Sequence, residues 1–108
     1  MNFKHGQSAR KGLETVMGDL VHLGYGNLIM WRRVVGIFPV FDPAGRRWQG
    51  EDFDTGRRLR AEAEGTGRLL NLASGHRVRS VILTDSNHVI LAAKDVAAVW
   101  RQVEIRRQ

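Results

Sequence analysis

Arginine is the residue type in this sequence with the greatest capacity for chemistry. Of the 17 basic residues only Lys4, Lys11 and Lys94 are lysines, and the formal net charge is +6. The planar guanidinium group binds phosphate oxygens and base edges in a bidentate manner and tolerates partial burial. The composition therefore favours nucleic acid as the partner, although arginine-rich codon usage would produce the same excess without a functional reason.

Two arginine pairs stand at the ends of predicted strands. Arg77 and Arg79 alternate at the start of one strand, so both side chains fall on one face about 7 Å apart. That spacing matches neighbouring phosphates along a nucleic-acid strand. Arg32 and Arg33 separate two apolar stretches, where side chains can project outward. Each pair alone fits a solvated surface, but with three further arginines they predict an electropositive rim. The further arginines are Arg57, Arg58 and Arg68.

The aromatic residues disfavour RNA as the partner. A sheet that recognises RNA carries exposed Phe or Tyr side chains on which bases stack. The strongest predicted strand, from Val78 to Thr84, contains no aromatic residue. Double-stranded DNA bound through its phosphates is therefore the favoured partner.

Residues for catalysis or metal binding are sparse. The chain has no cysteine, which excludes disulfides and thiolate metal sites. The four histidines, His5, His22, His76 and His88, show no spacing typical of metal ligands. Asp85 and His88 resemble an acid–base pair, but a carboxylate at this position more simply caps a hairpin turn. We therefore expect a protein that is not an enzyme and binds no metal or cofactor.

The apolar pattern predicts an α+β domain with a small, mainly antiparallel sheet, a short middle helix and a C-terminal amphipathic helix. The predicted strands cover residues 20–23, 28–31, 34–41, 67–73, 78–84 and 88–93, and the last two form a hairpin. The middle helix is predicted at Arg57–Glu64, capped by Asp54 or Thr55. An extended loop is expected at residues 39–54, and the last helix follows Asp95.

Residues 1–16 are basic and lack an apolar pattern, so we expect a flexible extension before a domain at residues 17–108. Met17 is a candidate for the native start. No apolar run approaches the length of a membrane span, and the opening lacks the core of a signal peptide. The absence of cysteine also fits a reducing compartment, so the expected location is the cytoplasm.

Two blocks of the sequence resemble the RemA family of extracellular-matrix regulators. The first is the Gly-aromatic-Gly-Asn turn within residues 23–29, followed by Arg and an apolar strand at residues 33–37. The second covers residues 74–92, with a Gly-His-Arg-Val-Arg run, a strand and Asp-Ser-Asn-His. The resemblance implies a small DNA-binding protein that assembles into ring-shaped homo-oligomers and activates genes for the biofilm matrix.

On this chain the resemblance places DNA-binding residues of the family at Arg33 and at the pair His76 and Arg77, with Arg79 close by. His76 stands where the family has an arginine, which weakens the site near neutral pH and could make it pH-sensitive. The loop from Phe38 to Thr55 is longer than the family's usual connection and brings additional arginines.

We therefore hypothesise a transcriptional regulator that binds duplex DNA as a homo-oligomer, probing shape rather than base sequence. The expected DNA-contacting residues are Arg33, Arg77 and Arg79, assisted by Arg32, His76 and Arg57. The subunits are expected to join through the sheet edge and the turn around Tyr25. Two alternatives stay open: a RemB-like protein-interaction module, because residues 21–24 and 35–38 also resemble that branch, and a small RNA-binding protein.

Overall fold

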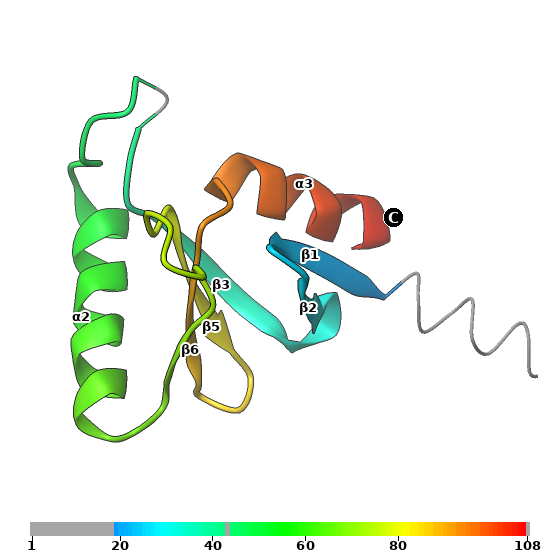
Figure 1. Cartoon of the computed structure of the whole chain (residues 1–108), viewed down its shortest axis with the longest axis horizontal. Coiled ribbons are helices and arrows are strands. Elements are labelled where there is room, and N and C mark those ends of the chain that lie inside the picture. Colours follow the sequence, from blue (N-terminus) through cyan, green and yellow to red (C-terminus); the bar gives the residue numbers. More distant parts are fainter. Residues whose placement is uncertain (1–18, 43, 108) are drawn as a thin grey trace, which may run out of the picture.

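The computed structural model describes residues 19–42 and 44–107, which contain six strands and three helical segments (Figure 1). In chain order they are β1 (Leu20–Gly24), β2 (Asn27–Met30), the 3-10 helix η1 (Trp31–Arg33), β3 (Val34–Pro39), α2 (Glu51–Gly65), β4 (Leu69–Asn71), β5 (Ser80–Thr84), β6 (Val89–Ala92) and α3 (Val96–Arg107). The predicted extension at residues 1–16 and the candidate start at Met17 lie outside the described residues.

The strands form two sheets. One has four strands in the order β3, β5, β6, β4, and the other is the two-stranded antiparallel ribbon of β1 and β2. β5 pairs with β3 and with β6 in antiparallel fashion, whereas β4 pairs with β6 in parallel. The predicted α+β class and the mainly antiparallel pairing are confirmed, and β4 is the exception.

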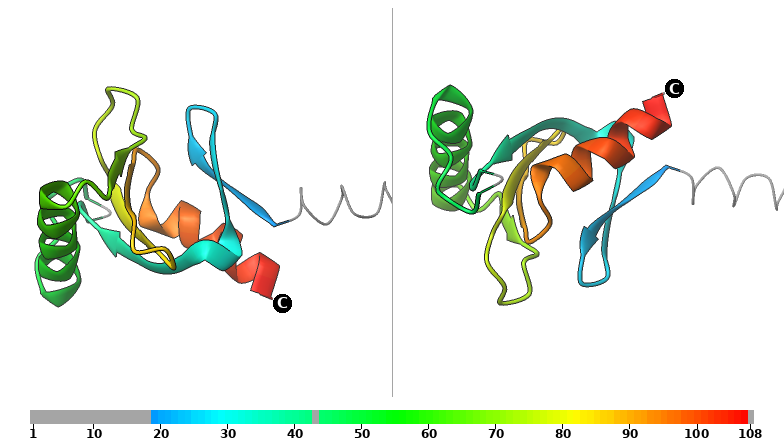
Figure 2. Two further views of the ribbon diagram at one scale, coloured as in Figure 1. Left: turned by 90° about the horizontal axis from the view of Figure 1, so that it is seen from below. Right: turned by 90° about the horizontal axis from the view of Figure 1, so that it is seen from above.

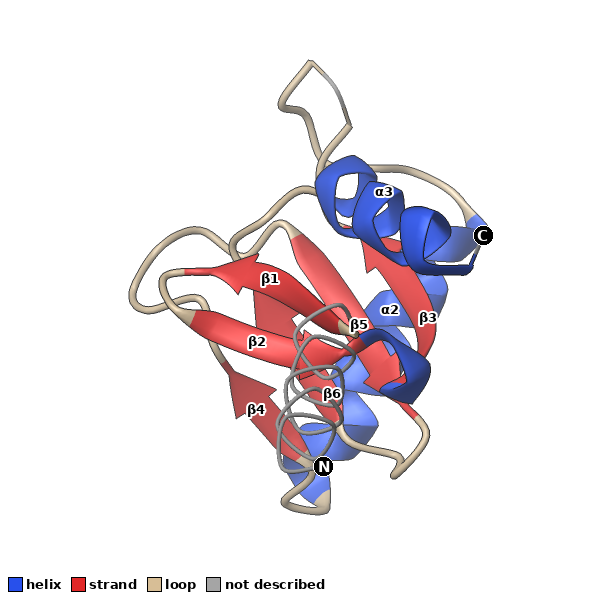
Figure 3. Cartoon of the chain, turned by 90° about the vertical axis from the view of Figure 1, so that its right-hand side faces the viewer, coloured by secondary structure: helices blue, strands red, loops and turns tan. Residues whose placement is uncertain are grey.

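The four-stranded sheet is the middle of three layers. α2 covers one of its faces, and α3 with the β1–β2 ribbon covers the other (Figures 2 and 3). Because side chains alternate along a strand, Ile82 packs with Val99 of α3 while its neighbour Val81 packs with Ala63 of α2. β5 and β6 are therefore buried on both faces, which explains why both read as apolar runs without polar alternation.

The middle helix begins earlier than the sequence predicts. The predicted helix covers Arg57–Glu64 with Asp54 or Thr55 as its cap, but α2 starts at Glu51, and the residue at its N-cap is Gly50. The predicted cap residues are thus inside the first turns of the helix. Three acidic side chains in the first turn interact favourably with the positive end of the helix dipole, which stabilises this early start.

Gly56 explains the close approach of α2 to the sheet. A Cβ atom at this position would lie 2.9 Å from Cβ of Phe38 in β3. Glycine is unfavourable within a helix, but here its missing side chain lets α2 lie directly against the strand. The loop predicted at residues 39–54 is consequently shorter, because β3 ends at Pro39 and the helix begins twelve positions later.

Candidate nucleic-acid interface

The arginines singled out by the sequence divide between two ends of the four-stranded sheet. β3 runs antiparallel to β5, so the start of β3 lies beside the end of β5. Arg32 and Arg33 precede β3 at one end, which we call the Arg33 end. His76, Arg77 and Arg79 precede β5 at the opposite end, the Arg77 end. The six residues of β3 separate the ends by roughly 16 Å, so one subunit does not gather all the predicted residues.

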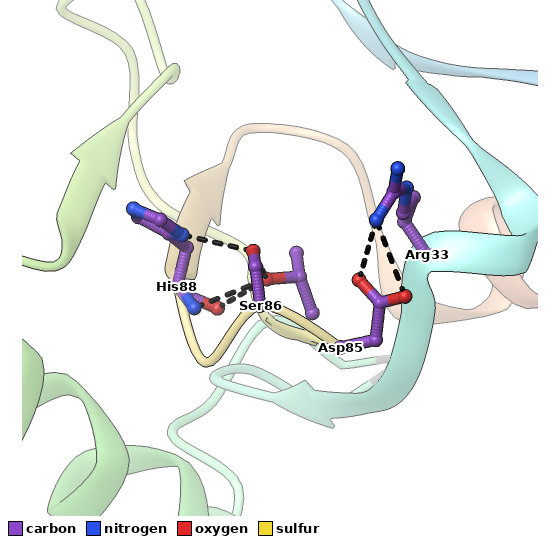
Figure 4. Close-up of polar contacts among 5 residues, drawn as sticks. Arg33, Asp85, Ser86 and His88 are labelled. Atoms are coloured by element: carbon purple, nitrogen blue, oxygen red, sulfur yellow. Dashed lines mark hydrogen bonds and ion pairs between the residues drawn. The ribbon is translucent and has the colours of Figure 1, made fainter.

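At the Arg33 end the guanidinium is paired with a carboxylate. Nη1 of Arg33 lies 3.4 Å from each carboxylate oxygen of Asp85 (Figure 4). The backbone N–H of Asp85 also donates a 2.9 Å hydrogen bond to the carbonyl oxygen of Arg33. Both side chains are well exposed, so the pair contributes at most about 1 kcal/mol to stability. Its main effects are to orient Arg33 and to offset part of its charge.

The turn between β5 and β6 is closed by hydroxyl groups. Thr84 Oγ1 accepts a 3.1 Å hydrogen bond from the backbone N–H of His88 and lies 3.0 Å from Ser86 Oγ. Ser86 Oγ in turn lies 2.9 Å from His88 Nδ1. The expectation that Asp85 caps this turn is wrong, because Thr84 does so while the carboxylate points to Arg33 (Figure 4). The carboxylate does not hydrogen-bond to His88, so these residues form no Asp–His acid–base pair.

At the other end, Arg77 is supported by an aromatic ring. Its Cζ atom lies 3.8 Å from the ring centroid of Phe41, which follows β3 and pairs with Arg47 in an isolated antiparallel bridge. Such a contact contributes about 0.5–1 kcal/mol at an exposed site. Arg77 is exposed and forms no ion pair with any described residue. Its full positive charge is therefore presented to solvent from a fixed position.

Arg79 differs from Arg77 because a carboxylate faces it. Nη1 of Arg79 lies 3.2 Å from Oδ1 of Asp95. Asp95 is the residue directly before α3. The strand predicted from Val78 begins at Ser80, so both arginines lie in the segment that leads into β5. The backbone of Arg79 is nevertheless held in place, since its N–H donates to the carbonyl oxygen of Ala92 at 2.8 Å.

His76 links the β1–β2 turn to the segment that carries Arg77. Its ring stacks on that of Tyr25, with centroids 4.0 Å apart and an angle of 7° between the planes. Tyr25 has a left-handed φ of 54° in the tight turn that the sequence predicts. Asn27 adds a second link, because its Nδ2 atom donates a 2.9 Å hydrogen bond to the carbonyl oxygen of Leu72. Contacts at both ends of the 72–76 segment thus hold this loop against the ribbon.

Arg57 and Arg32, the two remaining predicted residues, have different surroundings. Arg57 is exposed on α2, on the opposite face of the sheet from α3, and lines a groove with Pro39 and Val40 beside the Arg77 end. Arg32 is exposed at the Arg33 end, with its Cζ atom 5.6 Å from the centroid of the Trp31 ring. The structure therefore groups Arg32 with Arg33, and it places Arg57 beside the Arg77 end but on the α2 face of the sheet.

Sequence reasoning missed the partners that hold these arginines. The pattern places Phe41 in a strand and Asp95 directly before the last helix. Their contacts join segments that are 36 and 16 residues apart along the chain. No pattern within one segment predicts such a contact.

Features of other functional classes are not found in the part of the chain that the structure describes. Within residues 19–42 and 44–107, no three His, Cys, Asp or Glu side chains are gathered as a metal site would require. No helix in these ranges has both the length and the apolar character needed to cross a membrane.

Comparison with known proteins assigns the chain to a family. A family described as extracellular matrix regulatory protein A-like, or RemA-like, matches residues 20–102. A protein of Nitratidesulfovibrio vulgaris (strain DP4) is 45% identical over 80 residues, which cover 73% of this chain and 80% of that protein. A protein of Oleidesulfovibrio alaskensis is 43% identical over 74 residues (68% and 75% of the two chains), and one of Thermotoga neapolitana is 36% identical over 78 residues (71% and 72%). All three carry the name "Putative regulatory protein".

The matched region contains all of the secondary structure up to the middle of α3, including both ends of the sheet and the turns that carry Arg33 and Arg77. The relatives are named as regulatory proteins and not as enzymes. The protein belongs to the RemA-like family of regulatory proteins.

Proposed function

We propose that the protein regulates transcription of biofilm-matrix genes by binding the phosphate backbone of duplex DNA as a homo-oligomer. The observation that carries this proposal is Arg77, an exposed guanidinium seated 3.8 Å above a ring and without a carboxylate partner among the described residues. A cation held in this way loses little side-chain entropy when it binds a phosphate. Arg79 and Arg33 add further positive charge, each partly offset by an aspartate.

The separation of the two ends favours recognition of the backbone over many copies. Within one subunit, Arg33 and Arg77 are too far apart to grip the same phosphate. An oligomer repeats both ends around its surface, so that many individually weak contacts follow a long stretch of DNA. Contacts to phosphates carry no sequence information of their own, so selectivity would come from the shape and bendability of the DNA.

Exposed apolar side chains support assembly of this chain with copies of itself. Val35 on β3 is 62% exposed and Leu70 on β4 is 45% exposed, and these strands form the two outer edges of the four-stranded sheet. The β1–β2 ribbon adds Tyr25, Leu28 and Met30. Two different edges on one subunit suit a head-to-tail contact, and head-to-tail contacts that close produce a ring.

The experiment that tests this proposal compares an Arg77→Ala variant with the unchanged protein in binding to labelled duplex DNA. Arg101→Ala is the matched control, because Arg101 is an exposed arginine on α3, outside the segments that carry Arg33 and Arg77. We expect the Arg77 variant to bind at least tenfold more weakly and the Arg101 variant to bind within twofold of the unchanged protein. Light scattering on the same samples checks that the oligomer is intact.

Single-stranded DNA and RNA of the same sequence complete the design. Tighter binding to either single strand than to the duplex would overturn the proposal in favour of an RNA-binding protein. A folded oligomer that does not bind duplex DNA at low salt would overturn it in favour of a protein-interaction module.

A further inference from the structure

A groove of about 340 Å³ lies between α2 and the end of β3, on the face of the sheet opposite to α3. Its apolar floor is made by Pro39, Val40 and Val81. Its cationic rim is made by Arg47, Arg57 and Arg60. A volume of this size is at the lower end of the range of roughly 300–1,000 Å³ for sites that hold small organic molecules.

The three guanidinium groups of the rim are not neutralised by an ion pair with any described residue. The ion pairs within the described residues involve Arg33, Arg46 and Arg79 instead. Glu64 is the one acidic residue that lines the groove, so the lining carries an excess of two positive charges. Three forks around one concave surface are suited to the oxygens of a phosphate or carboxylate.

An aromatic ring forms one wall of the groove. Phe53 of α2 lines it, and the Cζ atom of Arg47 lies 5.6 Å from the centroid of the Phe53 ring. Guanidinium and phenyl groups both stack readily on flat conjugated ring systems. Together with the apolar floor, this wall favours a ligand that has a flat apolar body as well as its negative charge.

The charge pattern along α2 favours a small ligand over a long polyanion. The helix begins with Glu51, Asp52 and Asp54 and ends with Glu62 and Glu64, and its arginines lie between these acidic groups. DNA that followed the helix would meet carboxylates at both ends, and like charges at such distances repel each other. A molecule confined to the groove meets three arginines and only one carboxylate, that of Glu64.

We propose that this groove binds an organic phosphate with a flat aromatic body, of about the size of a nucleoside monophosphate. The phosphate is held by Arg57 and Arg60, and the aromatic body lies on the floor beside Phe53 and Arg47. The proposal does not depend on DNA binding, because the groove and the Arg77 end use different arginines.

The proposal is tested by calorimetric titration of the full chain, without DNA, with adenosine monophosphate, guanosine monophosphate and 1-naphthyl phosphate. We expect at least one of these to bind at least tenfold more tightly than both inorganic phosphate and its own dephosphorylated form. The double variant Arg57→Gln/Arg60→Gln is expected to weaken that binding at least tenfold. Arg101→Gln, which removes an exposed arginine on the opposite side of the sheet, is expected to leave it unchanged within twofold.

A second variant separates occupation of the groove from general attraction of anions. Ala61→Trp fills the groove from an exposed position on α2 without changing any charge, and it should weaken binding as strongly as the arginine double variant. Circular dichroism verifies that each variant is folded. Failure of all three aromatic phosphates to bind at millimolar concentration would overturn the proposal. So would binding that survives in folded Ala61→Trp, or an equal loss in Arg101→Gln.

Discussion

Replacing Asp95 by asparagine should strengthen DNA binding, because it removes the carboxylate that faces Arg79. Nη1 and Oδ1 are 3.2 Å apart, and the two side chains are 47% and 63% exposed. The attraction between such exposed groups is heavily screened by water, so freeing Arg79 is worth about 0.2–1 kcal/mol. That corresponds to about 1.4- to 5-fold tighter binding for each subunit whose Arg79 meets a phosphate. Asparagine also caps helices as well as aspartate does, so α3 should keep its start.

The assay is a titration of labelled duplex DNA followed by fluorescence anisotropy at low salt. Any loss of a negative charge makes a protein somewhat more attractive to DNA, so a matched control is needed. Glu62→Gln removes one exposed carboxylate from α2, on the face of the sheet opposite to α3 and Asp95. We expect the gain in Asp95→Asn to exceed the gain in Glu62→Gln by about 1.4- to 5-fold. Equal gains, or weaker binding by Asp95→Asn, would refute the view that the aspartate restrains Arg79.

Three further predictions concern the framework that positions the arginines. Gly56→Ala should lower the stability by about 1–3 kcal/mol despite better helix propensity, since its Cβ atom would lie 2.9 Å from Cβ of Phe38; a higher midpoint in urea denaturation would contradict this. Ser80→Ala should leave the stability unchanged or raise it by about 1 kcal/mol, because Ser80 Oγ is buried without a hydrogen-bond partner among the described residues. Thermal unfolding measures the change. A marked drop in the melting temperature would contradict this, because it would reveal a hydrogen bond to that hydroxyl. Tyr25→Ala removes the ring that stacks on His76, a contact worth about 0.5–1.5 kcal/mol. Backbone amides in the 74–79 segment should then exchange their hydrogens with solvent faster. Unchanged exchange would show that the stack does not hold this loop.

Residue type and apolar pattern are enough to predict much of this molecule. Apolar runs locate every strand, and the excess of arginine points to the basic residues at both ends of the sheet. The blocks at residues 23–37 and 74–92 suggest the RemA family, and the match over residues 20–102 confirms that membership. These features depend on local pattern, which a single sequence contains.

Contacts between distant segments are not predictable in the same way. Glycine is unfavourable within a helix, and the approach of α2 to Phe38 explains why Gly56 is tolerated there. The parallel pairing of β4 with β6 involves just three residues. The chain then crosses from β4 to β5, which lies on the other side of β6, and no local pattern predicts this crossing. The contact between Arg77 and the Phe41 ring is also a contact between distant segments. The sequence shows the charge of Arg77 but not the ring that supports it.

The most direct test of the proposed DNA binding is the salt dependence of affinity. The logarithm of the binding constant for duplex DNA is measured against the logarithm of salt concentration for the unchanged protein and for Arg33→Ala, Arg77→Ala and the Arg101→Ala control. Each phosphate that a protein neutralises adds about −0.9 to the slope. Both the Arg33 and the Arg77 variants should therefore show a shallower slope, by about 0.9 for each phosphate no longer neutralised, with the larger change in Arg77→Ala. The control should follow the unchanged protein. Identical slopes in all four proteins would contradict the account, because the two ends of the sheet would then not touch the DNA backbone.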